Sequence, residues 1–141
     1  MASTNLDIVR SIYAAWERGD YTSADWADPQ IEFAFADGPE PGSWKGISNM
    51  SRRYSEWLSG WKDFSAAPEE YIVVDEKRIL VLVHNRGRGR MSGLALDERS
   101  VANFFEISGG KVIRLVLYWN RNHALADLGL DPEAGIAEGP G

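Results

Sequence analysis

The stretch SGGKVIRLVLY, residues 108–118, decides the fold. Ser108 to Gly110 form a turn signal, and Leu115 and Leu117 then alternate along an apolar run that is typical of a strand. An Ala- and Leu-rich segment of helical length, residues 122–128, follows this run and stops at Gly129. We therefore predict a β-hairpin whose second strand spans residues 111–120 and leads into a short closing helix.

The segments before this hairpin extend the pattern of strands. Three further apolar runs predict strands over residues 64–74, 78–90 and 96–107. The turn DEK, residues 75–77, predicts a second hairpin between the first two of them. The second half of the chain is therefore expected to form an antiparallel sheet.

The first half of the chain favours helices. Apolar residues at helical spacing predict a helix over residues 5–18, ending near Gly19, and another over residues 47–61. Between them we predict a short helix over residues 21–28, a strand over residues 31–35 and a loop over residues 37–45, which is rich in Pro and Gly. Helices followed by antiparallel strands indicate the α+β class.

We expect one domain over residues 1–130 and a Gly-rich, mobile tail over residues 131–141. The expected architecture is a cone-shaped, curved, mostly antiparallel sheet that wraps around the N-terminal helices and encloses a pocket on its concave side. With 44% hydrophobic residues, 141 residues can fill one core, and six Trp, five Tyr and five Phe can also line a pocket.

Composition excludes several classes of function. A formal net charge of −6 disfavours binding to nucleic acid. Without Cys, and with two His far apart in the sequence, the chain lacks the pattern of a metal site, so we expect neither metal nor cofactor. The sequence contains neither a secretion signal nor an apolar run that could span a membrane, so we expect a cytoplasmic protein with no membrane partner.

Asp37 is the first candidate for chemistry. It ends a short apolar strand and precedes Gly46 by nine residues, just before an aromatic-rich helix. A carboxylate beside apolar walls is costly to keep charged and can carry a proton. The competing interpretation is structural, because Asp-Gly is a common turn dipeptide whose Asp binds nearby backbone groups.

At this point the chain resembles the nuclear transport factor 2-like superfamily, in its SnoaL-like (polyketide-cyclase-like) and ketosteroid-isomerase-like branches. The resemblance covers residues 6–130. It rests on four segments: IYAAWERGD, FAFADGPEPGSWKGISNMSRRY, SVANFFEISGGKVIRLVLYWN and HALADLGL. The superfamily includes isomerases, cyclases, dehydratases, epoxide hydrolases and proteins without catalytic activity, so the resemblance implies the fold and leaves the function open.

The resemblance to ketosteroid isomerases gives some of their functional residues, but not all, a counterpart in this sequence. Asp37 falls where those enzymes have their general base, and Asn103 falls where they have a protonated acid that donates to the developing enolate. Their oxyanion-hole Tyr aligns with Ile12. Tyr13 lies one residue later, about 100° around the helix, so it reaches the pocket only if the register shifts. Asp37 and Asn103 are thus the predicted catalytic pair, and steroid isomerisation itself is not expected.

The expected pocket lining is aromatic and aliphatic. The alternation of Asn103 with its strand neighbours and the resemblance together place the following residues around the cavity: Tyr13, Trp16, Phe35, Trp44, Tyr54, Trp57, Trp61, Val101, Phe105, Leu115, Leu117 and Trp119. Trp44, which lies in the predicted loop, is interpreted as a lid or rim residue. For each of the other aromatic residues, a place in the core is the competing interpretation.

Three further features have both a functional and a structural interpretation. His84 interrupts the strand ILVLVHN and is either a second proton carrier or a structurally hydrogen-bonded residue. Arg86, Arg88 and Arg90 share one strand face, and they either bind an anionic group or pair with acids across the sheet. Arg99, which follows Asp97 and Glu98, is a loose match to epoxide hydrolases of the superfamily, where an Arg between two carboxylates activates water.

Two main hypotheses for function follow. In the first, the chain binds an apolar small molecule and acts on it as a cofactor-independent isomerase, cyclase or lyase with Asp37 as general base. In the second, it is a non-catalytic ligand-binding or regulatory module, and an epoxide hydrolase-like activity is a weaker third. The resemblance also implies a homodimer that pairs through the outer face of the sheet.

Overall fold

The computed structural model of the chain describes residues 2–20, 24–37 and 41–130, and for residues 2–4 and 98–100 it describes the backbone alone. The expected tail, residues 131–141, lies outside the described residues. So does the side chain of Arg99.

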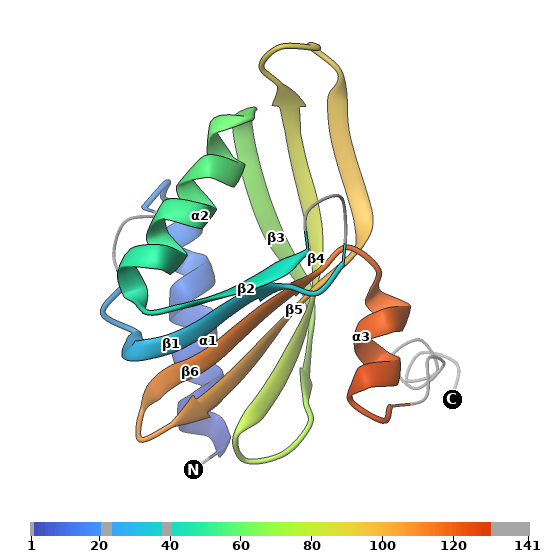
Figure 1. The fold of residues 1–141 in the computed structure, drawn as a ribbon. Coiled ribbons are helices and arrows are strands. Elements are labelled where there is room, and N and C mark those ends of the chain that lie inside the picture. The colour runs from blue at the N-terminus through green and yellow to red at the C-terminus, as the bar shows by residue number, and fades with distance from the viewer. Residues whose placement is uncertain (1, 21–23, 38–40, 131–141) are drawn as a thin grey trace.

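In the described residues, three helices and one six-stranded sheet make up the fold (Figure 1). The helices are α1 (Ala2–Glu17), α2 (Ile47–Ser59) and α3 (Arg121–Asp127). The strands are β1 (Ala27–Phe35), β2 (Gly42–Lys45), β3 (Trp61–Val73), β4 (Arg78–Gly89), β5 (Ala95–Ser108) and β6 (Lys111–Tyr118). Their order in the sheet is β2-β1-β6-β5-β4-β3. All neighbours are antiparallel except β1 and β6, which run parallel. The α+β class and both predicted hairpins are confirmed.

Helix α1 forms because its apolar residues recur every three or four positions. Val9, Ile12, Tyr13 and Trp16 are at most 4% exposed, and the helix packs against β3. Gly19 follows the helix with φ of 83°, a conformation that suits glycine at a helix end. The predicted end is confirmed, whereas the helix starts three residues before the predicted position.

The predicted helix over residues 21–28 is wrong in its described part. Residues 24–26 form a turn, and β1 already begins at Ala27, which pairs with Val112 of β6. Pro29 cannot donate to a sheet ladder, and the register of this pairing shifts between Ala27 and Glu32. The strand therefore continues past Pro29 with a local shift in register, whereas the sequence pattern had suggested that a helix ends there.

The predicted loop over residues 37–45 is wrong at its end. Gly42–Lys45 form β2, which pairs with β1 so that Trp44 lies opposite Phe33. The ring centroid of Trp44 lies 6.4 Å from that of Phe33 and 6.0 Å from that of Phe35. This aromatic packing accounts for a strand at the end of a segment that Pro and Gly otherwise mark as a loop.

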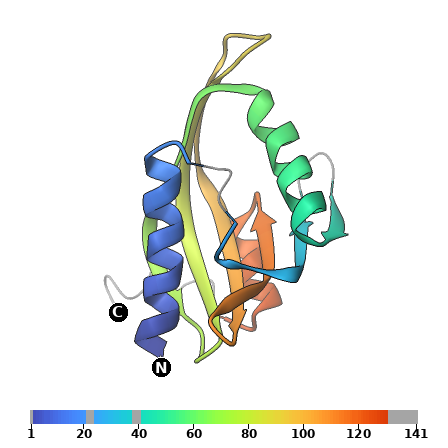
Figure 2. The ribbon, with the colours of Figure 1, turned by 90° about the vertical axis from the view of Figure 1, so that its left-hand side faces the viewer.

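The two faces of the sheet have separate apolar clusters. Along β4, Ile79, Val81 and Val83 belong to an inner cluster with α1 and α2, whereas Leu80 and Leu82 belong to an outer cluster with α3. Figures 1 and 2 show the hairpin between β4 and β5 rising beyond the rest of the sheet. No helix in the described ranges is long and apolar enough to cross a membrane.

Candidate functional site

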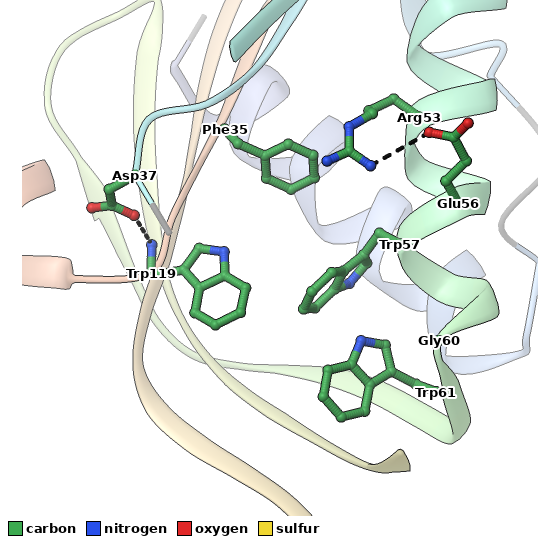
Figure 3. Close-up of a pocket in the computed structure, with 8 residues that line it drawn as sticks. All are labelled: Phe35, Asp37, Arg53, Glu56, Trp57, Gly60, Trp61 and Trp119. Atoms are coloured by element: carbon green, nitrogen blue, oxygen red, sulfur yellow. Dashed lines mark hydrogen bonds and ion pairs between the residues drawn. The ribbon is translucent and has the colours of Figure 1, made fainter. Parts of the chain in front are cut away.

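The pocket beside Asp37, which we call the main pocket, has a volume of about 270 Å³ and lies between α2 and the end of β6 (Figure 3). It is lined by Phe35, Asp37, Arg53, Glu56, Trp57, Gly60, Trp61 and Trp119. Trp57 is central to its wall: its ring centroid lies 5.4 Å from that of Trp61 and 5.4 Å from that of Trp119. All three indoles are only partly buried.

Parallel pairing of β1 with β6 brings Asp37 to this pocket. Phe35 pairs with Leu117, and the Ala36 amide donates to the Leu117 carbonyl over 3.0 Å. Asp37 therefore lies beside Trp119, whose backbone N–H donates to Oδ1 of Asp37 over 2.6 Å. The Asp37 side chain is 23% exposed. The Asp37 carboxylate is bound by a residue 82 positions away, so the interpretation as an ordinary local turn does not describe this contact.

His123 contacts the other oxygen of Asp37, and the sequence analysis did not select it. Its Nδ1 lies 2.7 Å from Oδ2 of Asp37. Asn120 caps α3 by accepting hydrogen bonds from the amides of Asn122 and His123, which fixes the first turn that carries the imidazole. The hydrogen bond to Asp37 raises the pKa of His123 above its ordinary value of 6.5, the charge of Asp127 adds to this rise, and partial desolvation opposes it.

The chain of polar contacts continues away from the pocket. Nε2 of His123 lies 3.4 Å from Oδ2 of Asp127, which also accepts a 3.0 Å hydrogen bond from the Tyr118 hydroxyl. Burial and then this hydrogen bond raise the pKa of Tyr118 to about 12. The His123 side chain is 40% exposed, so the imidazole connects Asp37 with solvent.

Asn103 lies in a second, smaller cavity of about 30 Å³. Its Nδ2 donates to the Tyr13 hydroxyl oxygen over 2.7 Å. Tyr13 is 1% exposed, and this burial raises its pKa well above the ordinary 10.0, with the Asn103 hydrogen bond opposing the rise. Tyr13, one position after the residue that the resemblance aligns with the oxyanion-hole Tyr, is thus the helix residue that reaches Asn103.

The predicted pair, Asp37 and Asn103, lines two neighbouring cavities and not a single one. Asp37 lines the main pocket, Asn103 lines the smaller cavity, and the two cavities share Phe35, Trp57 and Trp119 as walls. The structure therefore places a carboxylate and an amide in adjacent cavities that share three aromatic lining residues.

The other expected pocket residues are spread over several environments. Tyr54, Val101 and Leu117 line the smaller cavity with Asn103. Trp16 and Leu115 line a third cavity of about 20 Å³. Phe105 is fully buried in the inner core. Trp44 lies on β2 against Phe33 and Phe35 and does not line the main pocket, so its interpretation as a lid in a loop is corrected.

Arg53 and Glu56 are pocket residues that the sequence analysis missed. They lie one helical turn apart on α2, and Nη1 of Arg53 is 3.4 Å from Oε1 of Glu56. The Arg53 guanidinium also lies 4.9 Å from the ring centroid of Phe35 and 5.1 Å from that of Trp44. The available signal was the spacing of four residues between Arg53 and Trp57, which places these two on the same side of the helix, with Glu56 three residues after Arg53.

His84 and the arginine row lie away from the main pocket. His84 is 8% exposed, and its Nε2 lies 2.5 Å from Oδ1 of Asp97 on the neighbouring strand. Arg86, Arg88 and Arg90 are exposed, and Nη1 of Arg88 donates to the Gly93 carbonyl over 3.0 Å.

Comparison with known proteins shows which proteins have a similar fold. No protein-family model matches the chain, and no curated protein matches it. A nuclear transport factor 2-like protein of unknown function from Burkholderia pseudomallei has a TM-score of 0.72 and 17% identity, over 87% of this chain and 95% of its own. A putative SnoaL-like polyketide cyclase from Jannaschia has a TM-score of 0.70 and 14% identity, over 92% and 94%.

A third solved structure is a hypothetical protein with a ketosteroid isomerase-like fold from Catenulispora acidiphila, in complex with trimethylamine. Its TM-score is 0.66 and its identity 12%, over 88% of this chain and 93% of its own. At these identities the likeness concerns the fold alone. The chain therefore has the fold of the nuclear transport factor 2-like proteins, including those described as SnoaL-like and ketosteroid isomerase-like.

Proposed function

We propose that this protein binds a small, largely apolar molecule in its main pocket and transfers a proton to or from it with Asp37. The observation that carries the proposal is the position of Asp37: its carboxylate lines a pocket of three Trp side chains, while His123 contacts it from outside that lining. A base with this placement can reach a ligand and still exchange its proton with solvent.

The chemistry that fits this arrangement is proton abstraction next to a carbonyl group. Asp37 takes the proton, the electron pair of the C–H bond moves into an enolate, and the same carboxylic acid then returns the proton at another carbon. The smaller cavity has room for about one water-sized group and presents Asn103. We assign Asn103 as the amide donor that positions the enolate oxygen, with Tyr13 holding its orientation.

His123 acts through Asp37 in this proposal. Its protonated form donates to Oδ2 and stabilises the carboxylate between turnovers, and its partial exposure permits proton exchange with water. His123 is therefore a positioning and relay residue, and Asp37 is the group that contacts the substrate.

The experiment follows exchange of the acidic C–H protons of small enolisable ketones in D2O by NMR, because it needs no assumed product. Asp37→Asn should lower the exchange rate by about 10²–10⁴-fold. Asp63→Asn is the matched control, since Asp63 has φ of 55° and Asn also tolerates that conformation. Equal exchange rates in Asp37→Asn and the unmodified protein would refute the assignment of the base.

Non-catalytic ligand binding is the second candidate. It is favoured by the engagement of both Asp37 oxygens, one by the Trp119 amide and one by His123. The trimethylamine complex of the Catenulispora protein also supports the binding of a small molecule by this fold. A ketone that binds saturably but never exchanges its protons, in either the unmodified protein or Asp37→Asn, would favour this candidate.

Pairing of two chains through the outer face of the sheet is part of the proposal. Arg86 lies opposite Asp97 in the β4–β5 ladder, and the Asp97 side chain is 67% exposed, so both signs of charge lie on one surface. A two-fold axis can use such a surface for reciprocal ion pairs. Sedimentation equilibrium at micromolar concentration should give twice the monomer mass, and the monomer mass would refute dimerisation.

A further inference from the structure

The wall of the main pocket is an aromatic enclosure. The planes of Trp57 and Trp61 are inclined by 60°, and those of Trp57 and Trp119 by 74° (Figure 3). Three indoles at steep angles to one another present faces and edges to a shared space. Indole faces carry the negative end of the ring quadrupole, which attracts cations more strongly than the face of any other side chain.

The charged residues of the pocket add a net negative charge. Asp37 and Glu56 contribute two carboxylates and Arg53 one guanidinium, which leaves one net negative charge as long as His123, the partner of Asp37, is neutral. The two carboxylates lie on opposite sides of the pocket in Figure 3, with Phe35 and Arg53 between them and the indoles below. An occupant with one positive charge would balance this lining.

Arg53 shows how a cation is stabilised at this wall. Its side chain is only 17% exposed, yet its guanidinium lies over the rings of Phe35 and Trp44 and contacts Glu56. This cation is therefore held by aromatic faces and one carboxylate. The other side of the pocket repeats that combination of groups, with the indoles and Asp37.

From this geometry we infer that the ligand of the main pocket is a small organic cation, a tertiary or quaternary ammonium that carries short alkyl groups. The inference rests on the proposed function, since it adds an ammonium group to the enolisable molecule bound beside Asp37. Alkyl groups spread the charge and reduce the hydration that must be lost, and they contact the indoles. A volume of about 270 Å³ has room for a small ligand of this kind, since a cavity of about 150 Å³ already holds benzene.

Choline and its neutral isostere 3,3-dimethyl-1-butanol have the same shape but differ in charge, so a comparison of their affinities isolates the effect of the charge. Titration calorimetry on the full chain should show choline binding roughly tenfold more tightly than the alcohol, because the two differ only in the charged nitrogen. Equal affinities, or tighter binding of the alcohol, would overturn the assignment of a cation while leaving the proposed apolar pocket intact. Absence of binding by both probes would overturn the assignment and the proposed function together.

Amino-acid substitutions test whether choline binds in the main pocket. Glu56→Gln removes a carboxylate whose side chain is 60% exposed, so the fold should tolerate it, and it should weaken choline several-fold without affecting the alcohol. Glu76→Gln, in the turn between β3 and β4, is the control and should leave both affinities unchanged. An unchanged choline affinity in Glu56→Gln would contradict the electrostatic part of the inference.

The indoles are tested in the same titration. Trp61→Leu keeps an apolar side chain at the rim but removes an indole face, and it should weaken choline by about 5–10-fold. Trp26→Leu removes a partly buried indole that packs on Trp16 away from the main pocket, and its choline affinity should match that of the unmodified protein. Equal losses in both variants would indicate a general structural effect and overturn the assignment of the site.

Discussion

At the scale of single residues, the contact between Asp37 and His123 makes the site sensitive to pH. The raised pKa of His123 means that folding favours its protonated form, so the contribution to stability is fully present below about pH 6.5 and is lost as pH rises through the folded pKa. Since the imidazole is 40% exposed, this contribution should stay below about 1 kcal/mol.

Replacing Asp37 tests this coupling directly. In Asp37→Asn the carboxylate that holds the imidazolium is gone, so the pKa of His123 should fall toward its ordinary value. The measurement is an NMR titration of the His123 imidazole protons in both proteins. An identical titration of His123 in both proteins would contradict the role of Asp37.

The Asn103–Tyr13 hydrogen bond is a second prediction at this scale. Tyr13→Phe should reduce the free energy of unfolding by about 1–3 kcal/mol, because it removes the partner of a part-buried amide. Urea unfolding of Tyr13→Phe, Asn103→Ala and the double variant forms a cycle that isolates the pair. Strictly additive losses would show that the two side chains do not interact.

At the scale of elements, Gly46 controls the connection between β2 and α2. Its φ of 93° is unfavourable for residues with a Cβ, while an added Cβ would meet only the Pro29 carbonyl oxygen at 3.8 Å. Gly46→Ala should therefore cost about 1–2 kcal/mol through backbone strain alone. Gly60→Ala is the control, since its φ is −79°. Thermal unfolding should separate the two variants, and equal midpoints would refute the strain argument.

At the scale of the whole molecule, the inner core holds the sheet and the helices together. Phe105 is 0% exposed and packs edge-on against Tyr13 of α1 with ring centroids 5.9 Å apart. Phe105→Ala should lower the free energy of unfolding by about 3–5 kcal/mol. Met91 is fully exposed at the hairpin tip, so Met91→Ala should change the free energy of unfolding by no more than about 0.5 kcal/mol. Denaturant melts of both variants test this contrast.

The sequence predicted most elements because local patterns determine them. The spacing of apolar residues in α1 and the turn signals at residues 75–77 and 108–110 need no tertiary information. The described part of residues 21–28 was misread because the sequence gives no sign that β6 lies beside Ala27, and it is this neighbour that holds the chain as a strand from Ala27.

The site was predictable only in part, for the same reason. Asp37 could be selected from its place after a strand and before a helix. Its partner His123 could not, because the contact spans 86 residues and exists only through the parallel pairing of β1 with β6. Arg53 and Glu56 look like solvated helix residues until the aromatic residues of β1 and β2 are placed beside them.

The order of strands in the sheet also has a consequence during synthesis on the ribosome. β1 emerges before β6, although β6 is one of its two neighbours in the sheet. Until residues 111–118 leave the exit tunnel, β1 presents an open edge with Ile31, Phe33 and Phe35 along it. Such edges bind other extended chains. A nascent chain that stalls while residues 111–118 are still in the tunnel should therefore depend on chaperones. Once the residues up to 123 have left the tunnel, β1 can pair with β6 and the Asp37 site can form.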